Sequence, residues 1–311
     1  MTTQTETPTA MTKQQAWIHA MRPRTLPLAL SSIGMGIFLA AAAGLADWPV
    51  AIFCILTTIF LQILSNLAND YGDSKHGADS ITRRGPQRSV QMGLITAAEM
   101  KRAMFICASL AMVSGVILVY LAFGVQQGLL FLLFIALGAA AVWAAVAYTA
   151  TSNPYGYVGL GDLFVLIFFG WVGVAGSYFL HTAALSGAIL LPATSCGLLA
   201  VAVLNVNNIR DIESDRKAGK QSIPVRLGRE RARLYHWTLL VGAVLGAIVY
   251  VLLQPGNAWE WLFLLATPLL LRNGLAVTRG ETAAELDPYL KQMSLSTLAF
   301  VILLGLGQLL S

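Results

Sequence analysis

The sequence predicts an all-α protein that crosses a membrane nine times, and three observations support this class. Of the 311 residues, 57% are hydrophobic and only 11% are charged, whereas about a quarter of a soluble domain is charged. The chain holds nine mostly apolar segments close to the roughly 20 residues that a membrane-spanning helix needs. The Lys and Arg residues between these segments are distributed as one membrane orientation requires.

The apolar segments follow a polar start. Residues 1–16 lack the apolar stretch of a signal peptide, so we expect a disordered tail there and a single membrane domain over 17–311. The eighth segment is the shortest, and its ends are the least marked. The predicted spans lie near 24–44, 48–69, 103–123, 128–148, 160–180, 184–207, 234–254, 258–272 and 290–310.

All 20 Lys and Arg residues lie before the first span or between spans 2 and 3, 6 and 7, and 8 and 9. With nine spans, these segments share one side of the membrane. The positive-inside rule makes that side cytoplasmic, which predicts a cytoplasmic N-terminus, an outer C-terminus and the bacterial inner membrane. The net charge of +5 therefore reports topology. We expect no nucleic-acid binding, because no motif supports it.

Two acidic clusters end the second and sixth spans. Helix residues three and four apart share a face, and each cluster has this spacing, so each presents one amide and two carboxylates on one face. Because the two spans run in the same direction, both clusters reach the cytoplasmic boundary. The clusters are Asn66, Asp70 and Asp73 in the first span end, and Asn207, Asp211 and Asp215 in the second.

The four carboxylates would converge if the two helices face each other. They would then repel one another and be costly to desolvate unless cations lie between them. All-oxygen ligands favour hard cations, and above all Mg²⁺ when phosphate completes the shell. The Lys and Arg residues of the same loops favour a metal-bridged diphosphate. The simpler interpretation is that the carboxylates are solvated helix ends paired with nearby Lys and Arg.

These clusters resemble the two motifs of the UbiA superfamily of intramembrane aromatic prenyltransferases. Its first motif is N-D-x-x-D-x-x-x-D or N-x-x-x-D-x-x-x-D, and its second is D-x-x-x-D. Here NDYGD (69–73) matches the start of the first and DIESD (211–215) matches the second. Gly77 replaces the last Asp of the first motif, and Asp79 is a candidate substitute. The string RPRTLP (22–27) resembles the N-terminal element of the family.

Longer strings are similar to the branch that prenylates 1,4-dihydroxy-2-naphthoate in menaquinone synthesis. They are NLANDYGD (66–73), NNIRDIESDRKAGKQSIPVRLG (207–228) and YTATSNPYGYVGLGDLFVLIFFG (148–170). The resemblance implies nine helices around a central cavity open to lipid, with cap loops near 70–102 and 208–233. It implies a polyprenyl diphosphate bound through Mg²⁺, and transfer of its prenyl group to the naphthoate with loss of CO₂ and diphosphate.

The resemblance also implies a set of site residues. The expected metal ligands are Asn66, Asp70, Asp73, Asn207, Asp211 and Asp215, and the four Asp residues together with Asp162 are the expected catalytic residues. The expected diphosphate-binding cations are Arg22, Lys75, Arg84, Lys217, Lys220 and Arg226. The expected acceptor contacts are Tyr148, Asn153, Tyr155 and Asp162, while Asp79 as a substitute metal ligand and His76 as a catalytic residue are left open.

Other interpretations remain open from the sequence. Asp162 also suits a helix start, where the helix dipole favours a carboxylate, and the tyrosines suit an interfacial aromatic belt. Another reaction of the same superfamily, such as 4-hydroxybenzoate prenylation, would need a different acceptor and no loss of CO₂. From a different class, an ion or phosphate transporter would also carry charged groups in the membrane. Against transport, every charged motif lies at one membrane face.

Overall fold

The predicted helical class is confirmed by the structure, a computed structural model. It describes residues 11–75, 90, 92–254 and 256–311. Over this part of the chain, nine helical stretches are long and apolar enough to cross a membrane, which agrees with the predicted number. Their bounds are Lys13–Ala42, Trp48–Lys75, Ala97–Phe123, Gly128–Ala147, Gly161–Thr182, Gly187–Arg210, Arg229–Leu253, Ala258–Arg279 and Ala283–Leu310.

Some of these stretches are single helices and others are composite. The single helices are α3 (Trp48–Lys75), α4 (Ala97–Phe123), α5 (Gly128–Ala147), α11 (Arg229–Leu253) and α13 (Ala283–Leu310). The fifth stretch joins α6 (Gly161–Val165), the π-helix η3 (Leu166–Ala175) and α7 (Gly176–Thr182). The sixth joins the 3₁₀ turn η4 (Gly187–Ile189) to α8 (Leu190–Arg210), and the eighth joins the 3₁₀-helix η5 (Ala258–Ala266) to α12 (Thr267–Arg279).

The first stretch is broken near its start, and its beginning differs from the prediction. Helix α1 (Lys13–Met21) begins inside the predicted disordered tail, because Thr12 and Gln15 cap it reciprocally as in a capping box. Arg22 then adopts a left-handed backbone with φ of 49°. The chain continues through the 3₁₀ turn η1 (Pro23–Thr25) into α2 (Leu26–Ala42). Residues 1–10 of the predicted tail lie outside the described residues.

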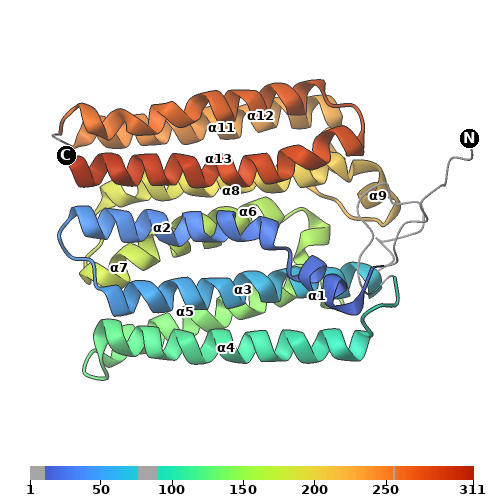
Figure 1. Ribbon diagram of the computed structural model, residues 1–311, viewed down its shortest axis with the longest axis horizontal. Helices are drawn as coiled ribbons and strands as arrows, with labels where there is room; N and C mark the ends of the chain where they lie inside the picture. The colour runs from blue at the N-terminus through green and yellow to red at the C-terminus, as the bar shows by residue number, and fades with distance from the viewer. Residues whose placement is uncertain (1–10, 76–89, 91, 255) are drawn as a thin grey trace, which may run out of the picture.

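The helices lie roughly side by side along the long axis of the molecule (Figure 1). Helix α8 is central. In the stretch that contains it, 61% of the residues in the most apolar part are buried, whereas the corresponding share for α5 is 6%. Large apolar side chains such as Leu129, Trp48 and Phe105 are exposed on the outside, as expected of surfaces that face lipid. The fold is therefore that of an integral membrane protein.

One end of the bundle gathers the basic connections. Helix α1, the short helix α9 (Ile212–Lys217) and the connection from α12 to α13 all lie at this end, whereas the C-terminus lies at the other (Figure 1). We call it the basic end. The short helix α10 (Ile223–Leu227) joins α9 to α11.

Candidate active site

A cavity of about 390 Å³ runs inward from the basic end. Asp73 and Cys54 both line it and are 19 positions apart on α3, which corresponds to about 28 Å along a helix. Charged and amide side chains line the part near Asp73, and apolar side chains such as Leu118 and Leu180 line the other end. The cavity thus joins a polar chamber to a long apolar channel.

The first acidic cluster is only partly on the cavity wall. Asp73, Asn66 and Asn69 line the cavity, whereas Asp70 is buried and does not. The Tyr157 hydroxyl donates a hydrogen bond to Asp73 Oδ1 at 3.1 Å. The Thr149 hydroxyl lies 3.0 Å from Asn69 Oδ1 and donates to it. Asp73, not Asp70, is therefore the carboxylate that this helix presents to the chamber.

The second acidic cluster lies across a helix break. Helix α8 ends at Arg210, and α9 begins at Ile212, with Asp211 between them. The backbone nonetheless keeps its helical hydrogen bonds, because Asp211 N–H donates to the Asn207 carbonyl at 3.1 Å and Asp215 N–H to the Asp211 carbonyl at 2.8 Å. All three predicted side chains of this cluster consequently line the cavity.

Arg210 ties the second cluster to the last helix. Its guanidinium makes two hydrogen bonds of 2.8 Å to the Asp211 carboxylate, the bidentate geometry that Arg favours. It also donates to Asp287 Oδ1 on α13 at 2.7 Å and to Asn207 Oδ1 at 2.9 Å. Arg24 approaches the other Asp287 oxygen at 3.7 Å. Helix α13 and the η1 turn are thereby linked to the acidic motif.

Lys220 neutralises the other end of the same cluster. Its ammonium lies 3.0 Å from Asp215 Oδ2, and both side chains are buried. Burial lowers the pKa of Lys220, whereas Asp215, Tyr148 and Asp73 raise it. The raising effects together are larger, so the pKa of Lys220 lies above its usual value. Burial raises the pKa of Asp215, and so do the charges of Asp211 and Asp73. Asp73 lines the same cavity as Asp211 and Asp215, so the two clusters share one chamber.

Three of the four predicted carboxylates line one cavity, but they do not converge on a single ion-binding point. Within the described residues, no three His, Cys, Asp or Glu side chains come close enough together to form a ready metal centre. Asp73, Asp211 and Asp215 each contact their own hydroxyl, guanidinium or ammonium partner. The donors that line the chamber are carboxylate and amide oxygens, which suit a hard cation such as Mg²⁺.

The cations of the chamber only partly match the predicted set. Arg22 and Lys220 line it, but Lys75, Lys217 and Arg226 are exposed and lie off the cavity. The Arg226 guanidinium instead donates to the Val158 carbonyl at 2.7 Å. Three predicted or discussed positions, Arg84, His76 and Asp79, lie outside the described residues, as does Gly77.

Arg24, Arg210 and Tyr157 reach the site although the sequence interpretation gave them no role there. Arg210 directly precedes the second motif, and a buried cation beside an acidic motif was a signal that could have been read. Arg24 belongs to the string that resembled the N-terminal element of the family. Nothing in the sequence indicates that Tyr157 contacts Asp73, since the two are 84 positions apart.

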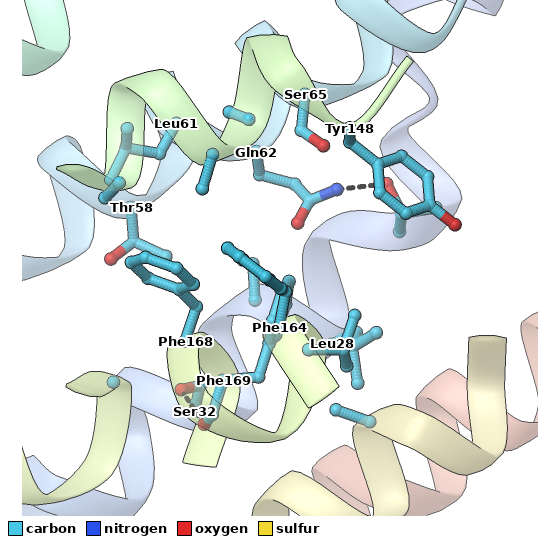
Figure 2. Close-up of a pocket in the computed structure, with 18 of the residues that line it drawn as sticks. Leu28, Ser32, Thr58, Leu61, Gln62, Ser65, Tyr148, Phe164, Phe168 and Phe169 are labelled. Atoms are coloured by element: carbon cyan, nitrogen blue, oxygen red, sulfur yellow. Dashed lines mark hydrogen bonds between the residues drawn. The ribbon is translucent and has the colours of Figure 1, made fainter. Parts of the chain in front are cut away.

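Aromatic side chains form one wall of the cavity. Tyr148, Phe164 and Phe168 line it (Figure 2), and Tyr155 belongs to the same lining. The rings of Tyr155 and Phe164 are stacked with centroids 4.1 Å apart. Burial raises the pKa of Tyr148 to about 12, so its phenol stays neutral at physiological pH.

Two predicted acceptor contacts lie away from this wall. Asn153 is exposed and does not line the cavity. Asp162 is also off the cavity lining, and the Tyr235 hydroxyl of α11 donates to its Oδ2 at 3.0 Å. Asp162 thus joins the fifth span to α11 at the basic end. In this structure it occupies a helix start, which was the other interpretation of its position.

The fold and the chamber define a class: an integral membrane protein in which buried acids and cations meet a deep apolar channel. The chain belongs to the UbiA prenyltransferase family, whose sequence profile matches residues 29–305. It is 46% identical to 1,4-dihydroxy-2-naphthoate octaprenyltransferase of Escherichia coli (strain K12) over 301 residues, which cover 97% of each chain.

Solved structures of the family have the same fold. A UbiA homologue from Aeropyrum pernix K1 in its apo form superposes with a TM-score of 0.63 at 18% identity, covering 93% of this chain and 96% of that chain. A UbiA homologue from Archaeoglobus fulgidus bound to GPP and Mg²⁺ gives a TM-score of 0.59, also at 18% identity, covering 93% and 99% of the two chains. At these identities the likeness concerns the fold alone.

Proposed function

We propose that this protein transfers a polyprenyl group from a polyprenyl diphosphate to 1,4-dihydroxy-2-naphthoate, with loss of CO₂ and diphosphate, as a step in menaquinone synthesis. The observation that carries the proposal is the joining of a charged chamber to an apolar channel in one cavity, which extends about 28 Å from Asp73 to Cys54. A diphosphate with a long isoprenoid tail has the same two parts. The naphthoate assignment is supported by the 46% identical Escherichia coli relative and its name.

Mg²⁺ fits the donor set of the chamber. Asp73, Asn207, Asp211 and Asp215 would hold it, because their oxygens line the cavity and hard cations prefer oxygen ligands. Asp70 is buried about one helical turn before Asp73 on α3, behind the residues that line the cavity, and would support the Mg²⁺ ligands from there. When bound, Mg²⁺ supplies positive charge that offsets the charge of the leaving diphosphate.

The protein's own cations serve the same diphosphate. Arg22, Arg24, Arg210 and Lys220 line the chamber and are the candidates to bind its oxygens. Preorganised charges of this kind stabilise the charge that develops as the allylic C–O bond breaks. The apolar channel holds the isoprenoid tail and excludes water from the allylic cation.

The acceptor ring completes the reaction on the aromatic wall. Its electron-rich carbon attacks C1 of the prenyl cation, and a C–C bond forms. In the naphthoate this carbon bears the carboxylate, which leaves as CO₂ and returns its electron pair to the ring. Tyr148 and Tyr155 both line the cavity, so such a ring would meet them there. The positive-inside rule supports a cytoplasmic position for the basic end in a bacterial inner membrane.

The reaction can be tested with the purified full chain in detergent. We would supply carboxyl-labelled 1,4-dihydroxy-2-naphthoate and a polyprenyl diphosphate, and measure labelled CO₂ and the prenylated product. Release of both, abolished by EDTA and restored by Mg²⁺, is the expected result. Asp211→Asn should remove turnover while the protein remains monodisperse. Turnover of 4-hydroxybenzoate alone would overturn the naphthoate assignment, and full turnover in EDTA would overturn the metal assignment.

A further inference from the structure

Gln62 presents a polar atom to the cavity one turn further into the membrane than Asn66. Both residues lie on α3 and line the cavity. In Figure 2 the Gln62 side chain is directed into the space that Phe164, Phe168 and Tyr148 border from other elements. The resemblance and the acidic motifs give this residue no role.

Neighbouring hydrogen bonds fix which end of the Gln62 amide faces the cavity. The Met21 carbonyl can only accept, so Asn66 must turn its Nδ2 toward it, at 2.8 Å. Asn66 Oδ1 then faces Gln62 and can only accept, which requires Gln62 Nε2 at that contact, at 3.2 Å. Gln62 Nε2 also donates to Thr25 Oγ1 at 3.2 Å.

The remaining atom of the amide is the carbonyl oxygen, Gln62 Oε1. Thr25 cannot donate to it, because the Thr25 hydroxyl proton is given to the Arg22 carbonyl at 2.9 Å. Among the described residues, no protein donor makes a hydrogen bond to Gln62 Oε1. The network therefore holds a hydrogen-bond acceptor that points into a largely apolar cavity.

This atom discriminates between the two substrates of the proposed reaction. An isoprenoid tail has no donor, so it leaves the oxygen unsatisfied, which is unfavourable in an apolar site. A carboxylate also has no proton to give. A ring hydroxyl does, and an aromatic ring suits the neighbouring Phe164 and Phe168. In 1,4-dihydroxy-2-naphthoate the 1-hydroxyl is adjacent to the carboxylate and donates to it, so the 4-hydroxyl is the free donor.

We propose that Gln62 Oε1 accepts a hydrogen bond from the 4-hydroxyl of the naphthoate acceptor while its ring lies against Phe164 and Phe168. Gln62 is then a specificity-determining residue that selects a hydroxylated ring and sets its depth in the cavity. This inference rests on the proposed function for the identity of the acceptor. It makes its own claim about how the acceptor is recognised.

The test is a comparison of binding, which needs no turnover. Dissociation constants of 4-hydroxy-2-naphthoate and 2-naphthoate are measured from ligand fluorescence for the full chain and for Gln62→Met. The unaltered protein should bind the hydroxylated ligand about tenfold more tightly, the usual worth of one hydrogen bond, and Gln62→Met should reduce this preference to within about twofold. Should Gln62→Met not give monodisperse protein, Gln62→Asn withdraws the oxygen by one methylene and gives the same comparison.

Thr57→Val is the matched control. Thr57 lines the same cavity on the same helix, but its hydroxyl already donates to Ser114 at 2.9 Å, so the tenfold preference should remain. The proposal is overturned if the preference persists in both Gln62 variants, or if Gln62→Met weakens both ligands equally, which would give Gln62 only the role of holding Asn66. A preference lost in Gln62→Met, in a protein that fails to prenylate naphthoate, would overturn the proposed function and leave this binding site standing.

Discussion

Tyr157 joins the two acidic motifs through Asp73. Its hydroxyl donates to Asp73 Oδ1 at 3.1 Å, and its carbonyl accepts the Gln221 N–H at 2.8 Å. Gln221 directly follows Lys220, which pairs with Asp215 of the second motif. One residue from the loop after α5 thus fixes a carboxylate of α3 and the segment that follows α9.

We expect Tyr157→Phe to raise the Mg²⁺ concentration needed for half-maximal activity by about 10–100-fold, the usual cost of losing a partner of a metal ligand. The reason is that Asp73 loses the hydroxyl that orients it. A Mg²⁺ titration of prenyl transfer measures the change. Tyr155→Phe is the control, because its hydroxyl donates to the Ala144 carbonyl at 2.9 Å and to no acid. An equal shift in both variants would contradict the role given to Tyr157.

Lys220→Met should lower the rate of prenyl transfer by about 100-fold or more, since it removes a buried cation from the chamber that receives the leaving group. The matched variant is Lys217→Met, which deletes the same charge three positions earlier at an exposed site. Its activity should stay within about twofold. The Michaelis constant and rate with the prenyl diphosphate report both effects, and a similar loss in both variants would show that only net charge matters.

Asp287→Asn should destabilise the protein by about 1.5–3 kcal/mol, the range for a hydrogen bond to a charged group. The change removes the charge that Arg210 contacts at 2.7 Å and Arg24 approaches at 3.7 Å. Thermal unfolding in detergent, followed by tryptophan fluorescence, measures it. Glu285→Gln is the control on the same helix, because the hydrogen bonds of Glu285 within the described residues are to Glu281 and Thr282 at the exposed helix start. Equal melting temperatures for the two variants would refute the importance of the Asp287 contacts.

Gly72→Ala should destabilise the protein by about 1–3 kcal/mol or more, because the added methyl overpacks a close contact. Its Cβ would lie 2.8 Å from Ala150 N and closer still to the Thr149 carbonyl, and backbone atoms cannot move aside as a side chain end can. The yield of monodisperse protein and its melting temperature measure the loss. Gly128→Ala meets no atom within 4 Å and should behave like the unaltered chain.

The fold could be predicted because membrane spans follow from composition alone. Nine apolar stretches and the placement of Lys and Arg depend only on the local sequence. The ends of the spans were less accessible. The eighth span extends to Arg279, beyond its predicted end, because α12 carries polar residues on one side and buries Asn273 and Gly274 on the other.

The site could be predicted where local spacing determines it. Asn207, Asp211 and Asp215 share a helical face, and the structure places all three on the cavity. Tyr157 and Asp287 could not be predicted, because their partners are 84 and 77 positions away and only tertiary packing brings them together. Proximity in sequence also misled: Lys75 and Lys217 lie next to the motifs but are exposed and do not line the chamber.

The packing of α13 against α2 has a consequence for biosynthesis. These helices lie side by side, with Gly305 accommodating Phe38, and Asp287 of the last helix supports the cations around the second motif. The first and the ninth membrane-spanning stretches of the described residues must therefore meet in the bilayer before the chamber has its full charge set. A nascent chain halted before Ala283 would lack the ninth membrane-spanning stretch and Asp287, so the chamber becomes competent only after that stretch has been inserted.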